Sequence, residues 1–340
     1  MSAHTAPILK RYRRLVFWAW FITFDLIMFG AFVRLTDSGL GCPDWPGCYG
    51  NLSPIGASEH IRDALTAMPY GPVSFPKAWI EMIHRYAGSI LGLLIIGITW
   101  MAWRWRGILR NSPALATVTL VAVCLQGAFG AWTVTHKLMP IIVTSHLMGG
   151  MLMLSLMTWL AAREKHHPPL TTSAQPWLPW ITIGFVLLLI QIALGGWVST
   201  NYAALACMDF PTCHGEWVPP MDFRGGFSLI RGLGVLPSGA MISQHALTAI
   251  HWTHRSFSVI VFVYMGVLAW RLRQTAGLGG PARLVLGLLV AQLFTGLTTI
   301  FFQWPLVIAV LHNGGAAGLV LATVTLLVRI TGQTRQGDNP

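Results

Sequence analysis

The chain has 340 residues, of which 54% are hydrophobic and only 10% are charged, and its mean hydropathy is +0.60. Soluble domains carry roughly a quarter charged residues. This composition therefore excludes an ordinary soluble domain and favours a chain surrounded by lipid. The formal net charge of +11 would also suit a nucleic-acid-binding protein, so the distribution of the charge has to decide between the two.

Eight apolar segments follow one another, each long enough to span a bilayer. We expect membrane-spanning helices at about 16–34, 78–103, 114–134, 139–162, 179–199, 243–270, 282–302 and 305–329. No small-residue cleavage site follows the first segment, so we expect it to be retained and not removed as a signal peptide. The predicted fold class is all-α and integral to the membrane.

Lys and Arg gather on one side of these spans. With the N-terminus in the cytoplasm, that side holds fourteen of the 22 Lys and Arg residues, and the side with the two long loops holds six. The positive-inside rule then places both termini in the cytoplasm and the long loops in the periplasm. Because no Arg- and Ser-rich import leader is present, we expect a bacterial inner membrane. The basic excess follows from topology, and nucleic acid is not an expected partner.

The chain repeats itself at an offset near 166 residues. Residues 30–50 read GAFVRLTDSGLGCPDWPGCYG and residues 195–215 read GGWVSTNYAALACMDFPTCHG, with eight of 21 positions identical. Further residues recur in register, namely His84-Arg85 and His254-Arg255, Gln126 and Gln292, Gly130 and Gly296, His146 and His312, and Gly149 and Gly315. We expect two tandem, pseudo-symmetric four-helix bundles, over 1–165 and 166–340, that face the same way across the membrane.

Four of the histidines inside the expected spans lie at matching positions of the second and fourth span of each half: His84, His146, His254 and His312. At 1.5 Å per residue they lie roughly 10–15 Å below the outer surface. Polar residues at that depth are costly and usually functional. Imidazole binds haem iron and other metals, but neither half offers the further ligands that zinc needs. The pattern predicts one haem between the two histidines of each half, with a hydrogen-bonded packing role as the alternative for a single histidine.

The halves differ beside the first histidine of each pair. Glu81 lies three residues before His84, on the same helix face, and the repeat has His251 in that place. The only other carboxylate in the expected spans is Asp25, which has no counterpart in the repeat and whose role stays open. A buried carboxylate beside a haem can accept a proton or stabilise positive charge. We expect the chemistry at Glu81, with an ion pair to a neighbouring cation as the alternative.

Arg85 and Arg255 directly follow two of the histidines, near the outer interface. Guanidinium groups pair well with carboxylates, so we expect both arginines to bind haem propionates. Simple extension of the side chains towards the interface is the alternative.

Four of the five cysteines form two pairs in the long outer loops. We expect the disulfides Cys42–Cys48 and Cys207–Cys213, because both pairs face the oxidising compartment, although four cysteines allow three pairings. Such bonds would staple the loops over the bundle mouth, and exchange with a periplasmic thiol carrier is the alternative. Cys124 stands alone in the third span and is expected to fill the core.

The loop GAFVRLTDSGLGCPDWPGC, the E-x-x-H-R motif of Glu81, His84 and Arg85, and the His-x-x-Gly motifs of the fourth and eighth spans resemble the haem A synthase family, over about residues 12–330. The resemblance implies an enzyme, a haem-dependent oxidoreductase. Such enzymes oxidise the C8 methyl of haem O to the formyl of haem A, in two successive hydroxylations, for terminal cytochrome oxidases.

The resemblance also implies a division of labour. His84 and His146 would take the substrate haem, with Glu81 as the catalytic carboxylate, and His254 and His312 would hold a permanent haem b. The cysteine pairs match those of many, but not all, family members. Haem O is the implied substrate, and haem O synthase is a candidate partner. A homo-oligomer is left open.

The asymmetry between the halves agrees with this division, because oxidising a methyl group needs a proton acceptor. We hypothesise that the C8 methyl is activated near Glu81 and that water supplies oxygen to a carbocation-like intermediate. Haem b would then pass electrons between the site and an external acceptor, a quinone or a thiol carrier.

Two other classes of protein share parts of the pattern. A di-haem transmembrane b-type electron-transfer cytochrome also pairs histidines, but it would normally place its haems towards both membrane faces, and all four histidines here lie in the outer half. A periplasm-facing membrane thiol oxidoreductase would use the loop cysteines and leave the histidines idle. Extracted pigment would distinguish the three classes.

Overall fold

The computed structural model describes residues 5–164, 170 and 172–337, and over these residues it is helical, with no β-strand. In this described part of the chain, eight helices are long and apolar enough to cross a membrane, as predicted. They are α1 (Thr5–Leu35), α3 (Phe75–Arg104), α4 (Pro113–Thr135), α5 (Pro140–Arg163), α6 (Leu178–Thr200), α8 (Gln244–Leu272), α9 (Gly279–Phe301) and α10 (Leu306–Gly337). The chain is a multi-pass membrane protein. The predicted boundary between the halves, at 165–166, lies outside the described residues.

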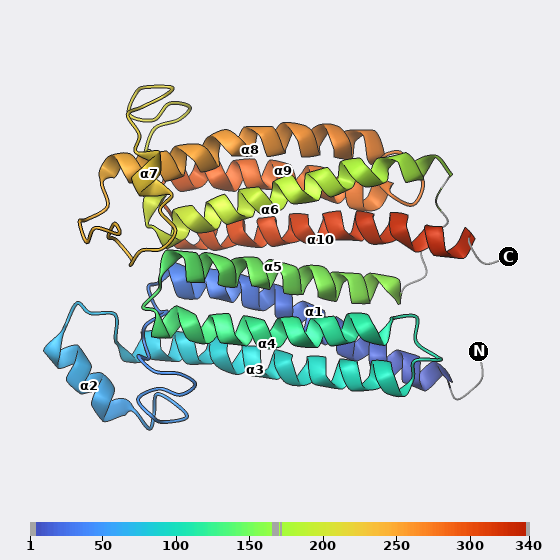
Figure 1. The fold of residues 1–340 in the computed structure, drawn as a ribbon, viewed down its shortest axis with the longest axis horizontal. Coiled ribbons are helices and arrows are strands. Elements are labelled where there is room, and N and C mark those ends of the chain that lie inside the picture. The colour runs from blue at the N-terminus through green and yellow to red at the C-terminus, as the bar shows by residue number, and fades with distance from the viewer. Residues whose placement is uncertain (1–4, 165–169, 171, 338–340) are drawn as a thin grey trace.

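The long loops and the termini lie at opposite ends of the molecule (Figure 1). The loop end carries the short helices α2 (Ser58–Ala67) and α7 (Phe223–Gly226) and the 3-10 turn η2 (Ala203–Leu205), and a second 3-10 turn, η1 (Thr172–Trp177), leads into α6. Hydropathy predicts none of these four elements, because they are too short and too polar to register as spans.

Two serines fix where two of the long helices begin. The Oγ atoms of Ser74 and Ser243 accept hydrogen bonds from the backbone amide three residues on, at 3.4 and 3.2 Å, and cap α3 and α8. A side-chain oxygen at this position satisfies an amide that the first turn leaves free. Because His84 lies on α3 and His254 on α8, the two caps set the depth of both histidines.

The helix α1 begins at Thr5, well before the predicted start near 16. The added turns contain exposed basic residues such as Arg11 and Arg14, which hydropathy counts against a span. Tyr12, between them, is fully buried, so one face of the extension packs against protein. Hydropathy locates the apolar stretch and says little about where the helix ends.

The eight long helices pack in two groups of four (Figure 1). In the first group α3 packs on α1 and α4, and α5 closes the group by packing on α4 and α1. In the second group α8 packs on α6 and α9, and α10 packs on α9 and α6. The helices α3 and α5 therefore stand at opposite corners of the first group, as α8 and α10 do in the second. The groups meet through α1 and α5 on one side and α6 and α10 on the other.

Glycines bring the two groups close together. A Cβ atom at Gly196 of α6 would lie 2.8 Å from the Leu147 side chain of α5. One at Gly314 of α10 would lie 3.1 Å from the Met28 side chain of α1. Close backbone approach through small residues is the usual packing of membrane helices, because lipid provides no hydrophobic drive between them.

A polar bridge joins the groups at the loop end. Arg34 donates a hydrogen bond to the Ser199 carbonyl oxygen (2.7 Å), and its guanidinium lies over the Tyr202 ring, 4.0 Å from the centroid. The Tyr202 hydroxyl in turn donates to Asp37 Oδ1 (2.6 Å), and Arg34 also pairs with Asp37 (3.2 Å). We call these four residues the Arg34 bridge.

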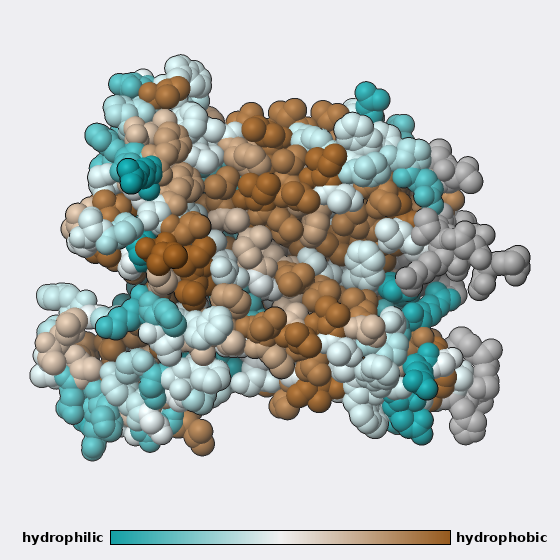
Figure 2. All heavy atoms as spheres, viewed as in Figure 1, coloured by the Kyte–Doolittle hydropathy of each residue, from teal (hydrophilic) through white to brown (hydrophobic). Residues whose placement is uncertain are grey.

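On the face shown in Figure 2, an apolar belt lies between two more polar ends. Large apolar side chains are exposed on it, among them Leu93 at 69% and Phe294 at 68%. Apolar patches of this kind mark contact with another apolar phase, so the belt is the surface that lipid covers. Cys124 is also exposed, and the prediction that it fills the core is wrong. Hydropathy cannot distinguish a lipid-facing position from a protein-facing one.

Candidate functional site

The four buried histidines form two pairs. His84 on α3 and His146 on α5, at opposite corners of the first group, are close enough to interact electrostatically. His254 on α8 and His312 on α10 do the same in the second group. All four lie in the half of the bundle nearer the loops, and each keeps some accessible surface.

Each imidazole packs against a glycine of a neighbouring helix. At three of these glycines a Cβ atom would crowd the imidazole Cε1 atom, and glycine leaves the ring that room; at the fourth, Gly296, a Cβ atom would make ordinary van der Waals contact. The pairs, with the distance from the Cβ position to Cε1, are Gly30 and His84 (3.2 Å), Gly130 and His146 (3.3 Å), Gly195 and His254 (2.9 Å), and Gly296 and His312 (3.4 Å).

A glutamine holds the backbone of one histidine in each pair. Gln126 Nε2 donates to the His146 carbonyl oxygen and Gln292 Nε2 to that of His312, both at 2.8 Å. Each glutamine side chain packs on the glycine three residues after the histidine. A Cβ atom at Gly149 would lie 2.1 Å from the Gln126 amide, and one at Gly315 would lie 3.0 Å from the Gln292 amide. The His-x-x-Gly motif therefore leaves room for this glutamine.

The halves differ at the imidazole Nδ1 atoms. In the second half, Thr295 Oγ1 lies 2.9 Å from Nδ1 of His312, and Gln191 Nε2 lies 3.1 Å from Nδ1 of His254. In the first half, the Nδ1 atoms of both histidines are buried without a hydrogen-bond partner among the described residues.

Glu81 is buried, with 4% of its surface exposed, and each of its carboxylate oxygens has a partner. Oε2 accepts a hydrogen bond from the Cys42 amide (2.8 Å), and Oε1 accepts one from Arg85 Nη2 (2.5 Å). The ion pair that the sequence left open is therefore present. The carboxylate is held both by its own helix and by the disulfide loop.

The corresponding residue of the second half, His251, makes the same kind of contact with its loop but is an imidazole and not a carboxylate. His251 is equally buried, and its Nδ1 lies 3.3 Å from the Cys207 amide. A disulfide cysteine thus anchors this helix position in both halves. Only the first half places a carboxylate there.

Arg85 and Arg255 tie their helices to the loops. Arg85 Nη1 donates to three carbonyl oxygens of the first loop, the nearest that of Gly47 at 2.5 Å. Arg255 donates to two carbonyl oxygens of the second loop, the nearer that of Asp209 at 2.5 Å. Contact of these arginines with haem propionates stays a prediction.

Both long loops are closed by disulfides, Cys42–Cys48 and Cys207–Cys213, each with a Cα–Cα distance of 4.9 Å. These are the predicted pairs. In the second loop the Asp209 carboxylate accepts hydrogen bonds from the Thr212 hydroxyl (2.7 Å) and from the Gly215 and His214 amides (2.9 and 2.8 Å). These donors hold the pKa of Asp209 well below its usual range.

The donor set suits haem iron better than a bare metal ion. Within the described residues no three His, Cys, Asp or Glu side chains gather as a metal site. Haem iron instead takes axial imidazoles, and two histidines at opposite corners of a bundle can supply them. Since the described Nδ1 atoms are either buried or hydrogen-bonded, Nε2 is the nitrogen left for iron. Both pairs fit this requirement.

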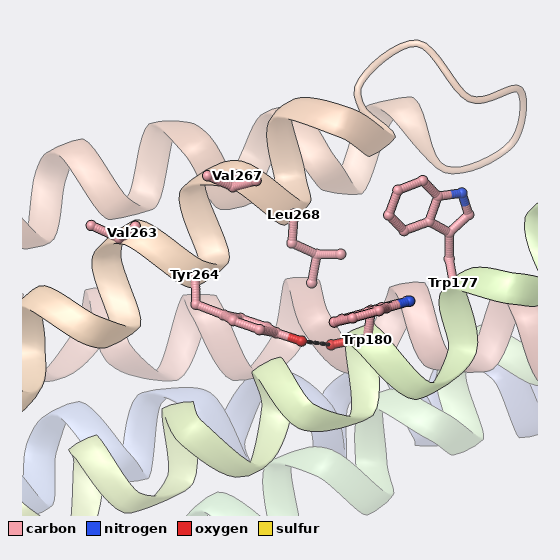
Figure 3. Close-up of a pocket in the computed structure, with 6 residues that line it drawn as sticks. All are labelled: Trp177, Trp180, Val263, Tyr264, Val267 and Leu268. Carbon is pink, nitrogen blue, oxygen red and sulfur yellow. Dashed lines mark hydrogen bonds between the residues drawn. The ribbon is translucent and has the colours of Figure 1, made fainter.

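A groove of about 290 Å³ between α6 and α8 is separate from these pairs (Figure 3). It is lined by Trp177, Trp180, Val263, Tyr264, Val267 and Leu268. Its one internal hydrogen bond runs from the Tyr264 hydroxyl to the Trp180 carbonyl oxygen (3.0 Å). The groove is apolar and lies towards the terminal end, so it belongs to the lipid-facing surface.

No single-span pattern predicts Gln191 and Thr295, which face the histidines from neighbouring helices. A comparison of the two halves contains the signal. When the halves are aligned on the glycines above, Gln191 corresponds to Leu26 and Thr295 corresponds to Phe129. A polar residue in one span where the other half has an apolar one marks a difference between the sites. Asp25 is exposed on α1 and does not join either pair.

Fold and site together define the class: a multi-pass helical membrane protein with a pair of histidines inside each of its two helix groups. The COX15-CtaA family model, described as cytochrome oxidase assembly protein, matches residues 13–324. The chain belongs to this family.

Two of the following three relatives span most of the chain. The chain is 39% identical over 306 residues to the heme A synthase of Shewanella oneidensis, which covers 89% of this chain and 92% of that protein. It is 26% identical over 369 residues to the heme A synthase of Sphingopyxis alaskensis, covering 97% and 96%. It is 28% identical over 239 residues to that of Halalkalibacterium halodurans, covering 68% and 73%.

Proposed function

We propose that this chain is a haem A synthase, a membrane oxidoreductase that oxidises the C8 methyl of haem O to a formyl group in two successive hydroxylations. The name of the relative at 39% identity supports this activity. The observation that carries it is Glu81, a buried carboxylate one turn from His84. The corresponding residue beside the other histidine pair is His251.

The two histidine pairs would then have different roles. His84 and His146, in the half over 1–165, would take the substrate haem O and hold the product haem A. His254 and His312, in the half over 166–340, would hold a permanent haem b. The support for this division is that a proton acceptor is needed only where the methyl group reacts.

The residues around Glu81 prepare it for that task. The Arg85 guanidinium and the Cys42 amide both donate to the carboxylate, and so stabilise its charged form. Both anchors also fix its direction, since one comes from the same helix and the other from the loop. Glu81 would accept the proton that the methyl carbon loses, water would supply the oxygen, and the external acceptor would take the two electrons that each hydroxylation releases. The bound haem would supply the iron and carry the methyl group.

The charge distribution supports a topology in which both termini are cytoplasmic and the long disulfide-bonded loops are periplasmic, in a bacterial inner membrane. Arg11, Arg14 and their basic neighbours lie at the terminal end of α1. An electron acceptor, either a quinone or a thiol carrier, and haem O synthase are the partners that this activity would need.

Replacement of Glu81 by Gln tests the proposal. In cells that supply haem O, Glu81→Gln should keep bound haem, because the histidines are untouched, and should lose haem A in the extracted pigment. His251→Gln, at the corresponding position, is the matched control and should still yield haem A. Haem A from Glu81→Gln at the wild-type level would contradict the role of Glu81.

The wild-type pigment tests the class of protein. Haem A supports the synthase, whereas haem b alone would point to an electron-transfer cytochrome. A protein that purifies without haem would point to a thiol oxidoreductase that uses the loop disulfides.

A further inference from the structure

Thr295 of α9 offers His312 a hydrogen-bond acceptor. The Thr295 hydroxyl donates to the Ala291 carbonyl oxygen (2.8 Å), so its oxygen is free to accept from Nδ1–H of His312 at 2.9 Å. A proton on Nδ1 leaves Nε2 unprotonated, which is the form that binds iron. Thr295 therefore selects the tautomer of His312 and fixes the direction of its ring.

Gln191 of α6 makes a similar contact with His254. Its side-chain nitrogen lies 3.1 Å from Nδ1 and 3.2 Å from the carbonyl oxygen of His254, and its Oε1 atom is buried without a partner. In this orientation the amide nitrogen donates to the carbonyl oxygen of His254; a half-turn of the amide would bring Oε1 to Nδ1–H as an acceptor and would give up that bond to the backbone. In either orientation a polar group holds this imidazole.

The first half has apolar side chains at both positions. The glycines that face the imidazoles set the register: Gly30 corresponds to Gly195, and Gly130 to Gly296. In that register Gln191 is replaced by Leu26 and Thr295 by Phe129. The Phe29 ring lies 6.0 Å from that of His84 between centroids, and Nδ1 of His84 has no hydrogen-bond partner among the described residues.

This difference matters for how firmly a haem is held. A partner on the second nitrogen orients a ligating histidine, and a partner that accepts from its N–H, as Thr295 does, also raises its basicity; losing such a partner typically costs 10–100-fold in metal affinity. An imidazole whose Nδ1–H is buried unpaired also carries a desolvation cost. Of two otherwise equivalent histidine pairs, the first should therefore hold a haem less firmly than the second.

We propose that Gln191 and Thr295 are positioning residues that make the second site retain its haem, and that Leu26 and Phe129 make the first site an exchange site. A site whose haem is both substrate and product has to release it at every turnover, whereas a cofactor site should not. This inference rests on the proposed function, which assigns the two haems to the two halves.

Transfer of haem to apomyoglobin from the purified, haem-loaded protein tests the second site. Thr295→Val should release haem b about 10- to 100-fold faster than wild type. It should also raise the reduction potential of that haem, since a less basic ligand stabilises the oxidised iron less. Thr295→Ser keeps the hydroxyl and should stay close to wild type.

Two further variants keep the test independent of folding. Thr298→Val removes a hydroxyl that bonds only to the α9 backbone (2.8 Å to Phe294 O), and it should change neither rate nor potential. Gln191→Leu introduces the residue that the first half has at this place, and it should behave like Thr295→Val. If Thr295→Val and Gln191→Leu match Thr298→Val in both readouts, the proposal is overturned.

The reciprocal change tests the first site. Leu26→Gln should slow the release of haem A, so that more haem A copurifies with the protein. An unchanged haem A content would overturn the exchange half of the proposal. The outcome is separate from the proposed function: a wild type that makes no haem A contradicts the synthase, whereas normal haem A production with unaltered retention in these variants contradicts only the positioning roles.

Discussion

A glycine opposite each histidine determines how closely an imidazole can approach the neighbouring helix. Glycine inside a helix costs about 1 kcal/mol relative to alanine, so four such glycines at matching places need a steric reason. The distance from the missing Cβ to the ring supplies one. It is shortest at Gly195, 2.9 Å from His254, and longest at Gly296, 3.4 Å from His312.

Alanine substitutions should therefore have graded effects within one half. Gly195→Ala should displace the His254 ring and lower the haem content of the second half, whereas Gly296→Ala meets only ordinary van der Waals contact and should leave it nearly unchanged. Gly287→Ala, which meets nothing within 4 Å, is the matched control on α9. The readout is the Soret absorbance per protein. Equal haem content in Gly195→Ala and Gly287→Ala would argue against steric control.

At the scale of helices, the spans could be predicted because lipid demands about 20 apolar residues in each. The histidine pairs could be predicted because polar residues in those spans are rare. The contacts of Gln191 and Thr295 could not, because they depend on how each helix is rotated against its neighbour. The anchoring of Glu81 by the Cys42 amide also escapes a linear pattern, since it joins a loop to a helix across the bundle mouth.

The second disulfide loop should keep its fold on mild acidification. The pKa of Asp209 is lowered by the Thr212 hydroxyl and by two backbone amides. A lowered pKa adds stability that is present above the ordinary carboxyl value of about 3.9 and is lost only as pH falls through the lowered one. Protection factors from hydrogen exchange of this loop should thus stay constant from pH 7 to about 5.

Asp209→Asn should lower this protection at every pH, because the amide accepts fewer hydrogen bonds than the carboxylate. Loss of protection in the wild-type loop already between pH 7 and 5 would mean that another group controls it.

For the whole molecule, the Arg34 bridge ties the two helix groups together where the loops begin. Burial and the hydrogen bond to Asp37 raise the pKa of Tyr202, so its hydroxyl remains a neutral donor at ordinary pH. A raised tyrosine pKa gives stability that is complete below about pH 10 and is lost as pH rises through the raised value. The bridge should therefore be insensitive to pH between about 6 and 9.

Two substitutions separate the components of the bridge. Tyr202→Phe removes the hydroxyl and keeps the ring under Arg34, and it should cost about 1 kcal/mol. Arg34→Ala leaves the hydroxyl bond in place and removes the ion pair with Asp37, the bond to Ser199 and the ring contact, so its cost should be larger. Thermal unfolding in detergent measures both, with the fully exposed Tyr70 changed to Phe as control. A Tyr202→Phe variant as unstable as Arg34→Ala would contradict this order.

The position of Glu81 along α3 has an electrical consequence. It lies six residues into a helix of 30 residues, about 9 Å along a length of about 45 Å. Moving one elementary charge across the whole membrane involves about 2.3 kcal/mol per 100 mV. A proton that leaves Glu81 towards the loops crosses only a small part of that voltage drop. The proposed oxidation would thus run at nearly the same rate in an energised and in a depolarised membrane.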